Sequence, residues 1–212
     1  MRGSSCLGFS GEMSIWVLAS GRGSNFEVIA RRCAEGSIPA KLLGLIVDRP
    51  CPAEDRARRL GVPLLRLGRS WSDELLEVLS SRRSDLVVLA GFMRVLPPPL
   101  VRAFYPRVVN LHPALLPSFP GMDAIGQAYR HGVKVTGITV HLVDEGVDTG
   151  PIVLQRAIRV REEWTLEELE RAIHRLEHRW YPVAIRDLLL RAWTVEGRVF
   201  KFLDRPEGRV RS

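Results

Sequence analysis

The chain has 212 residues, 46% hydrophobic and 26% charged, which suits one globular α/β domain or at most two small ones. No apolar run reaches the roughly 20 residues of a transmembrane helix, and the first residues lack the apolar centre of a secretory signal. The formal net charge of +7 fits an arginine-rich surface or an anionic ligand. No basic run is interleaved with aromatic residues, so a nucleic-acid partner is not expected.

The three cysteines, Cys6, Cys33 and Cys51, show no C-x-x-C spacing. This argues against a disulfide framework and a zinc site, and it favours a reducing cytoplasm. Residues 1–13 are expected to form a flexible extension, residues 14–202 a single domain, and residues 203–212 a polar tail.

Strand-like and helical patterns alternate through the first half of the chain. Short apolar runs typical of buried strands occupy residues 14–19, 41–47, 62–67, 85–90 and 107–109. Helical periodicity follows the first three runs, and three consecutive prolines, which suit a helix start, follow the fourth. The alternation predicts a doubly wound α/β fold, with a mostly parallel sheet and helices on both faces. Right-handed crossovers place the loops after these strands at one edge, where ligands collect.

The second half predicts a change in the sheet. A short helix is expected within residues 121–132, followed by strands at 133–143 and 152–160. The tight E-G-V-D-T-G connection between these strands suggests antiparallel neighbours, so the sheet is expected to be mixed. The longest helix should run from Thr165 to about Trp193, with a capping box at its start and an apolar stripe that includes Trp180 and Val183. A hairpin is expected near residues 194–202.

A glycine-serine loop, S-G-R-G-S-N, joins the first strand to the first helix at residues 20–25. Such a loop directs backbone N–H groups and the positive end of a helix toward a phosphate. A dinucleotide site is one alternative, but Phe26 stands where the third glycine belongs and Asp48 lies slightly beyond the usual spacing of the ribose-binding acid. A plain strand-to-helix turn is another.

An amide, an imidazole and a carboxylate follow predicted strand ends. Asn110 and His112 close the fifth apolar run, and Asp148 lies in the glycine-punctuated loop before the last strand. The amide and a protonated imidazole can stabilise an oxyanion, while the carboxylate can orient the imidazole and raise its pKa. The pattern therefore predicts acyl-type transfer. No histidine spacing indicates a metal site, no G-x-S-x-G elbow is present, and His141 reads as a core histidine.

Two long motifs carry a resemblance. N-L-H-P-A-L-L-P-S-F-P-G, starting at Asn110, and G-V-K-V-T-G-I-T-V-H-L-V-D-E-G-V-D-T-G-P, starting at Gly132, resemble the phosphoribosylglycinamide formyltransferase family over residues 14–202. The resemblance implies a Rossmann-like formyltransferase fold. It also implies transfer of a formyl group from the co-substrate 10-formyltetrahydrofolate to the amine of 5-phosphoribosylglycinamide, in purine synthesis and without a metal.

The resemblance also implies the site residues. It assigns catalysis to Asn110, His112 and Asp148, phosphoribosylglycinamide binding to Gly23, Ser24, Asn25 and Glu177, and folate binding to Arg69, Met93, Arg94, Val95, Leu96 and Asn110. Read from the residues alone, Arg69 is a solvated loop cation, and Glu177, His174 and His178 are solvated helix residues. The family often has histidine at Asp123 and a larger polar residue at Gly126, and no role is carried over to either.

Three alternatives differ in class or in substrate. Methionyl-tRNA formyltransferase shares the catalytic logic but carries a further C-terminal domain that 212 residues cannot house. Formyltetrahydrofolate hydrolase usually has an additional N-terminal regulatory domain. A non-catalytic nucleotide-binding module would use the glycine-serine loop and leave Asn110, His112 and Asp148 without a joint purpose. The expected partners are small molecules, and both a monomer and a homodimer stay open.

Overall fold

The central strands are apolar along their whole length, as burial on both faces requires. The computed structural model describes residues 12–203, so most of the predicted N-terminal extension and C-terminal tail lie outside the described residues. Strand β1 (Ser14–Ala19) sends Ile15 and Val17 into one apolar layer and Trp16 and Leu18 into the other.

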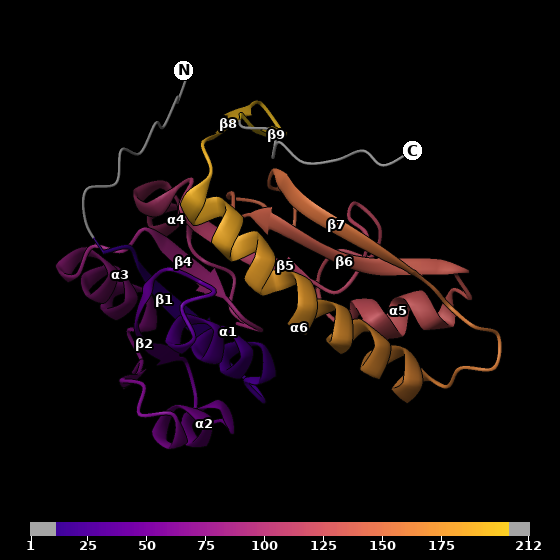
Figure 1. Cartoon of the computed structure of the whole chain (residues 1–212), viewed down its shortest axis with the longest axis horizontal. Coiled ribbons are helices and arrows are strands. Elements are labelled where there is room, and N and C mark those ends of the chain that lie inside the picture. Colours follow the sequence, from indigo (N-terminus) through magenta and orange to yellow (C-terminus); the bar gives the residue numbers. More distant parts are fainter. Residues whose placement is uncertain (1–11, 204–212) are drawn as a thin grey trace.

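The described strands form a seven-stranded sheet in the order β3-β2-β1-β4-β5-β6-β7 (Figure 1). Their bounds after β1 are β2 Lys41–Val47, β3 Leu64–Arg66, β4 Leu86–Leu89, β5 Val108–His112, β6 Val135–Leu142 and β7 Ile152–Arg159. The first five strands are parallel, whereas β6 and β7 are antiparallel. The predicted mixed, doubly wound α/β fold is therefore confirmed, and the antiparallel pairing of β6 with β7 is right, although residues 143–151 make a longer connection than a tight hairpin.

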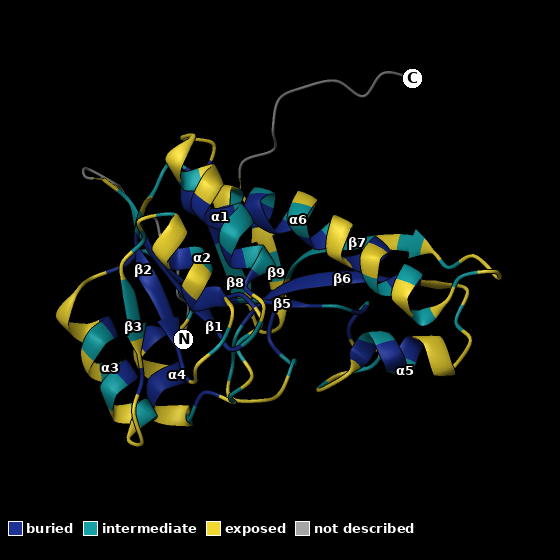
Figure 2. Cartoon of the chain, turned by 90° about the horizontal axis from the view of Figure 1, so that it is seen from below, coloured by how far each residue is buried: buried dark blue, intermediate teal, exposed yellow. Residues whose placement is uncertain are grey.

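Helices cover both faces of this sheet (Figure 2). Their bounds are α1 Ser24–Ala34, α2 Ala53–Arg59, α3 Trp71–Ser81, α4 Pro98–Phe104, α5 Ala124–Arg130 and α6 Leu166–Leu190, and β8 (Trp193–Glu196) pairs with β9 (Val199–Phe202) in a separate hairpin. Helices α1 and α6 pack on one apolar layer, whereas α3 and α4 pack on the other. Because β1 and β4 lie in the middle, the loops after them reach the centre of one sheet edge.

Helix α6 packs across the sheet and has two anchors, one at its N-terminal cap and one in its middle. Its predicted capping box is present, since Thr165 accepts from the Glu168 N–H and the Glu168 carboxylate accepts from the Thr165 N–H. In its middle, the buried Tyr181 hydroxyl donates to the carbonyl oxygens of Leu89 at 2.8 Å and Val109 at 3.2 Å. The helix is therefore fixed to β4 and β5, the strands whose ends carry predicted site residues.

In the second half of α6, the buried stripe is shifted by one residue from the predicted stripe. Trp180 and Val183 are only half-buried, whereas Tyr181 and Ile185 are buried against the sheet. Trp180 instead lies between two arginines, with the Arg156 guanidinium 4.0 Å from its ring centroid. Its indole therefore covers the outer strand β7 beneath cationic side chains.

Candidate active site

Strand β5 presents Asn110 and His112 on the same face, because side chains two residues apart along a strand point the same way. The neighbouring strand β6 places His141 opposite Asn110 and Thr139 opposite His112. Directly opposed residues of an antiparallel pair share a face. The sheet therefore gathers an amide and two imidazoles at one position near the carboxyl end of β5.

Asp148 joins this cluster from the loop between β6 and β7. Its backbone φ is 54°, and its Oδ2 lies 3.3 Å from His112 Nδ1 and accepts from the Gly121 N–H at 2.8 Å. Its Oδ1 lies 3.4 Å from His141 Nε2 and 3.5 Å from Asn110 Nδ2. The structure thus brings together the three residues predicted to be catalytic and adds His141 to them.

His112 is only 3% exposed, and both ring nitrogens face acceptors. Its Nε2 donates to the carbonyl oxygen of Phe119 at 2.8 Å, while Nδ1 faces Asp148. Burial lowers the pKa of His112, and the raising effects of Asp148 and the Phe119 carbonyl do not overcome it, so the net pKa lies below 6.5. Asp148 therefore raises the pKa of His112 as expected, but desolvation of the buried ring outweighs this effect.

Asp148 stays ionised in this setting. Burial works to raise its pKa, but the hydrogen bond from His141, the Gly121 N–H and the positive potential of His112 outweigh it, so the pKa of Asp148 lies below its ordinary value. His141 Nδ1 lies 2.9 Å from the carbonyl oxygen of Leu142, and its Nε2 lies 3.2 Å from Asn110 Nδ2 and 3.4 Å from Asp148 Oδ1. Asn110 Nδ2 also donates to Asp148 Oδ1 at the long distance of 3.5 Å, so both neighbours of its amide nitrogen belong to the cluster.

The loop that follows His112 is fastened by side chains that sequence reasoning did not single out. The Thr139 hydroxyl is fully buried, donates to the Ala114 carbonyl at 2.7 Å and accepts from the Leu116 N–H at 3.0 Å. Gln155 Nε2 donates to the Leu116 carbonyl at 2.8 Å. Strand alternation puts Thr139 and His141 on one face of β6, and the pairing of β6 with β5 brings that face next to Asn110 and His112.

The glycine-serine loop begins α1 with a left-handed residue. Gly23 has φ 71°, and a Cβ there would lie 2.6 Å from the Ala53 Cβ, so both conformation and space require glycine. Ser24 and Asn25 form the first turn of α1, where helix geometry leaves N–H groups without intrahelical partners. The predicted phosphate-binding residues are thus arranged as an anion site requires.

Glu177 of α6 lies against this loop. Its Oε2 accepts from Asn25 Nδ2 at 3.0 Å and lies 2.9 Å from His174 Nδ1. The interpretation of Glu177 as a solvated glutamate is wrong, because the residue is only 5% exposed. His174 is half-exposed and paired, and His178 is half-buried with its Nε2 enclosed, so neither is simply solvated.

The loop after β4 holds the residues predicted to bind folate. Met93 and Val95 are exposed, Leu96 is buried, and the Met93 N–H donates to the Ser20 hydroxyl at 2.8 Å, which ties this loop to the glycine-serine loop. The Arg94 guanidinium donates through Nε to Asp48 Oδ2 at 2.8 Å and lies 5.1 Å from the Trp71 ring centroid. Arg69 is exposed in the loop before α3.

Asp48 does not behave as a ribose-binding acid. Its side chain is fully buried and paired with Arg49 and Arg94. Burial works to raise its pKa, but hydrogen bonds from Arg49, Ser20 and Arg94 outweigh it, so the pKa of Asp48 lies below its ordinary value. The carboxylate that a dinucleotide site would offer to ribose is therefore occupied by arginines.

Asp123 and Gly126, to which the resemblance carried over no role, lie against each other at the start of α5. Asp123 begins α5 with φ 55°, and its carboxylate lies where a Cβ on Gly126 would be, 2.4 Å from Oδ1. The same carboxylate pairs with Arg130 at 2.9 Å on the exposed side of α5. The two residues are thus complementary in space, and the exposed Asp123 pairs with Arg130 and not with the cluster around Asp148.

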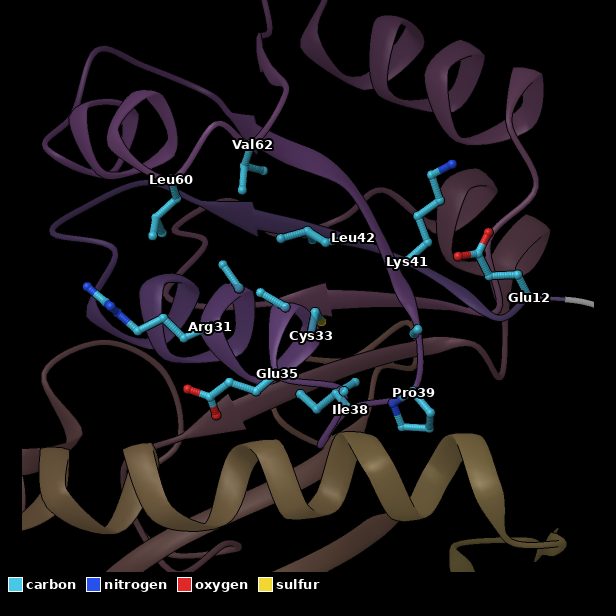
Figure 3. Close-up of a pocket in the computed structure, with 14 residues that line it drawn as sticks. Glu12, Arg31, Cys33, Glu35, Ile38, Pro39, Lys41, Leu42, Leu60 and Val62 are labelled. Carbon is cyan, nitrogen blue, oxygen red and sulfur yellow. The ribbon is translucent and has the colours of Figure 1, made fainter.

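A hollow elsewhere carries none of the predicted site residues (Figure 3). It is lined by Ile38, Leu42, Leu60 and Val62 together with Cys33, whose pKa burial raises to about 11. It lies at the end of α1 and the start of β2, the opposite edge from Gly23. Within residues 12–203, no cluster of acidic, histidine or cysteine side chains has the grouping of a metal site, and none of the helices there is both long and apolar enough to span a bilayer.

Comparison with known proteins agrees with this geometry. The family model described as "Formyl transferase" matches residues 13–185. The phosphoribosylglycinamide formyltransferase of Bacillus subtilis is 45% identical over 181 residues, which cover 82% of this chain and 93% of the relative. The family match spans the glycine-serine loop, β5, Asp148 and most of α6.

Two solved structures are similar over most of the chain. Glycinamide ribonucleotide transformylase 1 from Symbiobacterium toebii superposes with a TM-score of 0.86 at 44% identity, covering 96% of this chain and all of that one. A formyltetrahydrofolate deformylase from Pseudomonas syringae has a TM-score of 0.84 at 26% identity, covering 92% of this chain and 67% of that one. From the family match and these similarities, the chain belongs to the formyl transferase family.

Proposed function

We propose that the chain transfers the formyl group of 10-formyltetrahydrofolate to the amine of 5-phosphoribosylglycinamide in purine biosynthesis. The observation that carries the proposal is the contact of Asn110, His112 and Asp148 at the end of β5. The first turn of α1, where we expect the phosphate of the substrate to bind, follows β1 of the same sheet. Relatives that are 45% and 41% identical to this chain carry the name phosphoribosylglycinamide formyltransferase.

The phosphate of the substrate would lie at Gly23, Ser24 and Asn25. Free N–H groups in the first turn of α1 and the positive end of its dipole favour an anion there. Glu177, held beside Asn25, offers a carboxylate to donor groups on the rest of the same substrate. The ends of β1 and β5 then determine how the amine is presented to the cluster.

The folate co-substrate would bind along residues 93–96, with Asn110 at its reactive end and Arg69 at the exposed rim. Because Arg94 is committed to Asp48, we assign its side chain to holding this loop and its backbone to the folate. Met93 and Val95 are exposed apolar side chains that a bound ring system would cover.

The reaction begins when the neutral amine attacks the formyl carbon and forms a new C–N bond. The resulting oxyanion is stabilised by His112 and by an Asn110 N–H, which exchanges its long contact with Asp148 for the oxyanion. To reach His112 Nε2, the oxyanion replaces the Phe119 carbonyl, which occupies that nitrogen at 2.8 Å. With the Phe119 carbonyl displaced, the neutral ring carries its proton on Nδ1, toward Asp148. Nε2 therefore takes up the proton that the amine releases and returns it to N10 of the folate as the C–N10 bond breaks. Asp148, 3.3 Å from Nδ1, stabilises the imidazolium formed in between.

We expect a cytoplasmic protein that acts as a monomer or a homodimer on small-molecule substrates and needs no metal. The Pseudomonas deformylase supplies the rival reaction, in which water replaces the amine. The proposed phosphate site at the start of α1 favours the transferase, because hydrolysis does not require a phosphorylated acceptor.

The deciding experiment follows the folate product by absorbance, with 10-formyltetrahydrofolate present and phosphoribosylglycinamide either added or omitted. Loss of the formyl group that depends on the amine supports the transferase. Loss without the amine would instead assign the hydrolase, and no reaction in either mixture would contradict both.

His112→Ala tests the centre of the mechanism in the same assay. Removing the imidazole takes away both the proton carrier and one oxyanion contact, so kcat should fall by about 10³-fold or more. The control is Lys134→Ala, which removes an exposed side chain between α5 and β6. Normal turnover of His112→Ala would contradict the mechanism.

A further inference from the structure

Three groups in a row connect α6 to the start of α1. His174 and Glu177 lie one helical turn apart on α6, and Asn25 belongs to the first turn of α1. Both His174 Nδ1 at 2.9 Å and Asn25 Nδ2 at 3.0 Å reach the same carboxylate oxygen, Glu177 Oε2. No hydrogen bond to the other oxygen, Oε1, is formed by any residue within 12–203.

Two acceptor oxygens of this arrangement, one on Asn25 and one on Glu177, have no hydrogen-bond donor within the described residues. Asn25 Oδ1 is enclosed and has no hydrogen-bond partner within the described residues. Buried polar atoms are costly unless they are paired. Because the Asn25 amide gives its N–H to Glu177, its oxygen and the free Glu177 oxygen are two acceptors beside the proposed phosphate loop. The orientation of both depends on how firmly Glu177 is held.

We propose that His174 is a positioning residue for the phosphorylated substrate: its Nδ1–H and positive charge fix the Glu177 carboxylate beside Asn25. This inference rests on the proposed function and names a residue that acts on the substrate through Glu177. His174 itself is 47% exposed, so it can exchange protons with solvent while Glu177, at 6%, cannot readily find another partner.

The charged groups near His174 and its neighbour His178 lie on α6, in the loop before α1 and on α2. On α6, Glu177 and Glu170 attract its proton, and the stacked His178 ring lies 6.5 Å away between centroids. Arg22, before α1, opposes protonation of His174, and Arg56 of α2 opposes protonation of His178. The hydrogen bond to Glu177 is the largest of these effects and raises the pKa of His174 above 6.5. Binding of the phosphorylated substrate should therefore weaken as the pH rises through that pKa.

The experiment measures the dissociation constant of phosphoribosylglycinamide by calorimetry, and the KM and kcat of both substrates, from pH 6 to pH 9. His174→Ala should weaken substrate binding about fivefold at the low end, the scale of a half-exposed charged hydrogen bond. The KM for the folate and kcat should stay within about twofold, since the cluster around Asp148 is untouched.

His174→Asn keeps a donor near the position of Nδ1 and removes the charge. Its dissociation constant should lie between those of the wild type and His174→Ala at low pH, and its ratio to the wild-type value should approach one as the pH rises and wild-type His174 loses its charge. Arg175→Ala is the matched control, because it removes one charge from the next, exposed position of α6. Its dissociation constant should equal that of the wild type.

Each other outcome overturns a stated claim. Unchanged binding in His174→Ala overturns the role of His174, and an equal loss in Arg175→Ala replaces the contact by a general charge effect. Wild-type protein that binds the substrate without turnover overturns the proposed transfer while leaving the test of His174 intact. Wild-type protein that neither binds nor reacts overturns both.

Discussion

Asp148 serves four neighbours with two oxygens, and this makes it the most connected side chain of the candidate site. It contacts His112, His141, Asn110 and the N–H of Gly121. The last contact reaches across from the segment that follows His112. A change at Asp148 should therefore alter the ionisation of His112 and the path of that segment together.

Asp148→Asn should lower kcat and move the acid limb of the kcat/KM profile to lower pH. The carboxylate raises the pKa of His112 against the larger effect of burial, so its loss lowers that pKa further. His112 accepts a proton as a neutral base, and activity falls as the pH drops through its pKa. A pH series from 4.5 to 8 on both proteins measures this, and an acid limb that stays or moves upward would contradict the assignment.

Part of the site could be predicted at this scale. Asn110 and His112 stand at a strand end before proline, and Asp148 stands in a loop with glycines on both sides, so residue types and positions indicated them. The Phe119 carbonyl and the Gly121 N–H could not be found in this way. Every residue carries such groups, and their direction depends on the path of the loop.

Single elements determine how rigidly the site is held. The segment after β5 depends on the buried hydroxyl of Thr139 in β6, which supplies both a donor and an acceptor to it. Helix α6 depends on Tyr181, whose hydroxyl bridges the carbonyls of β4 and β5. Each contact joins elements that are distant in the sequence, and this is why the burial of Glu177 escaped a reading of α6 alone.

Thr139→Val should leave the fold in place and loosen the segment after His112. Valine matches the shape of threonine but leaves the Leu116 N–H and the Ala114 carbonyl without this partner, at a cost of about 2–3 kcal/mol. Chemical denaturation measures the loss, and kcat should fall more than the KM of either substrate. An unchanged kcat would show that the segment needs no such anchor.

Tyr181→Phe tests the attachment of α6. The substitution keeps the ring and removes the hydroxyl, so unfolding free energy should fall by about 1–2 kcal/mol. Because Glu177 lies one turn before Tyr181, binding of phosphoribosylglycinamide should weaken modestly while folate binding does not change. Urea unfolding and calorimetry give the two values, with Tyr129→Phe, an exposed tyrosine on α5, as the control.

At the scale of the whole molecule, buried ionisable groups should govern stability against acid. The pKa values of His112 and His178 are lowered, chiefly by burial. Their contribution to the unfolding free energy is therefore present above pH 6.5 and is lost as the pH falls through the lowered pKa values. Glu54 and Asp148, whose pKa values are also lowered, add a second loss nearer pH 4. His174, whose pKa is raised, acts oppositely and loses its contribution as the pH rises above 6.5.

Unfolding free energy should therefore be greatest near pH 6.5, fall clearly toward pH 4, and fall by less on the alkaline side. Urea denaturation at intervals of half a pH unit measures the profile. His112→Asn should flatten the segment between pH 5 and 6.5. A wild-type profile that is level across that segment would contradict the burial of neutral histidines as its cause.

The architecture was predictable at this scale because strand patterns and their alternation with helices carry it directly. The change to antiparallel β6 and β7 followed from two adjacent strand patterns with one loop between them. The displaced stripe of α6 did not follow, since Trp180 fits an apolar stripe equally well but pairs with arginines over β7.

Asp123 and Gly126 also constrain how this chain can change through evolution. A side chain at position 126 has to displace the Asp123 carboxylate, which gives up its contact with Arg130. Once position 123 no longer carries that carboxylate, the three atoms nearest to a Cβ at 126 are gone, and the same substitution gains the helix propensity that glycine lacks. The effect of a mutation at one position thus depends on the residue at the other, and the two positions are expected to change in a preferred order, 123 before 126.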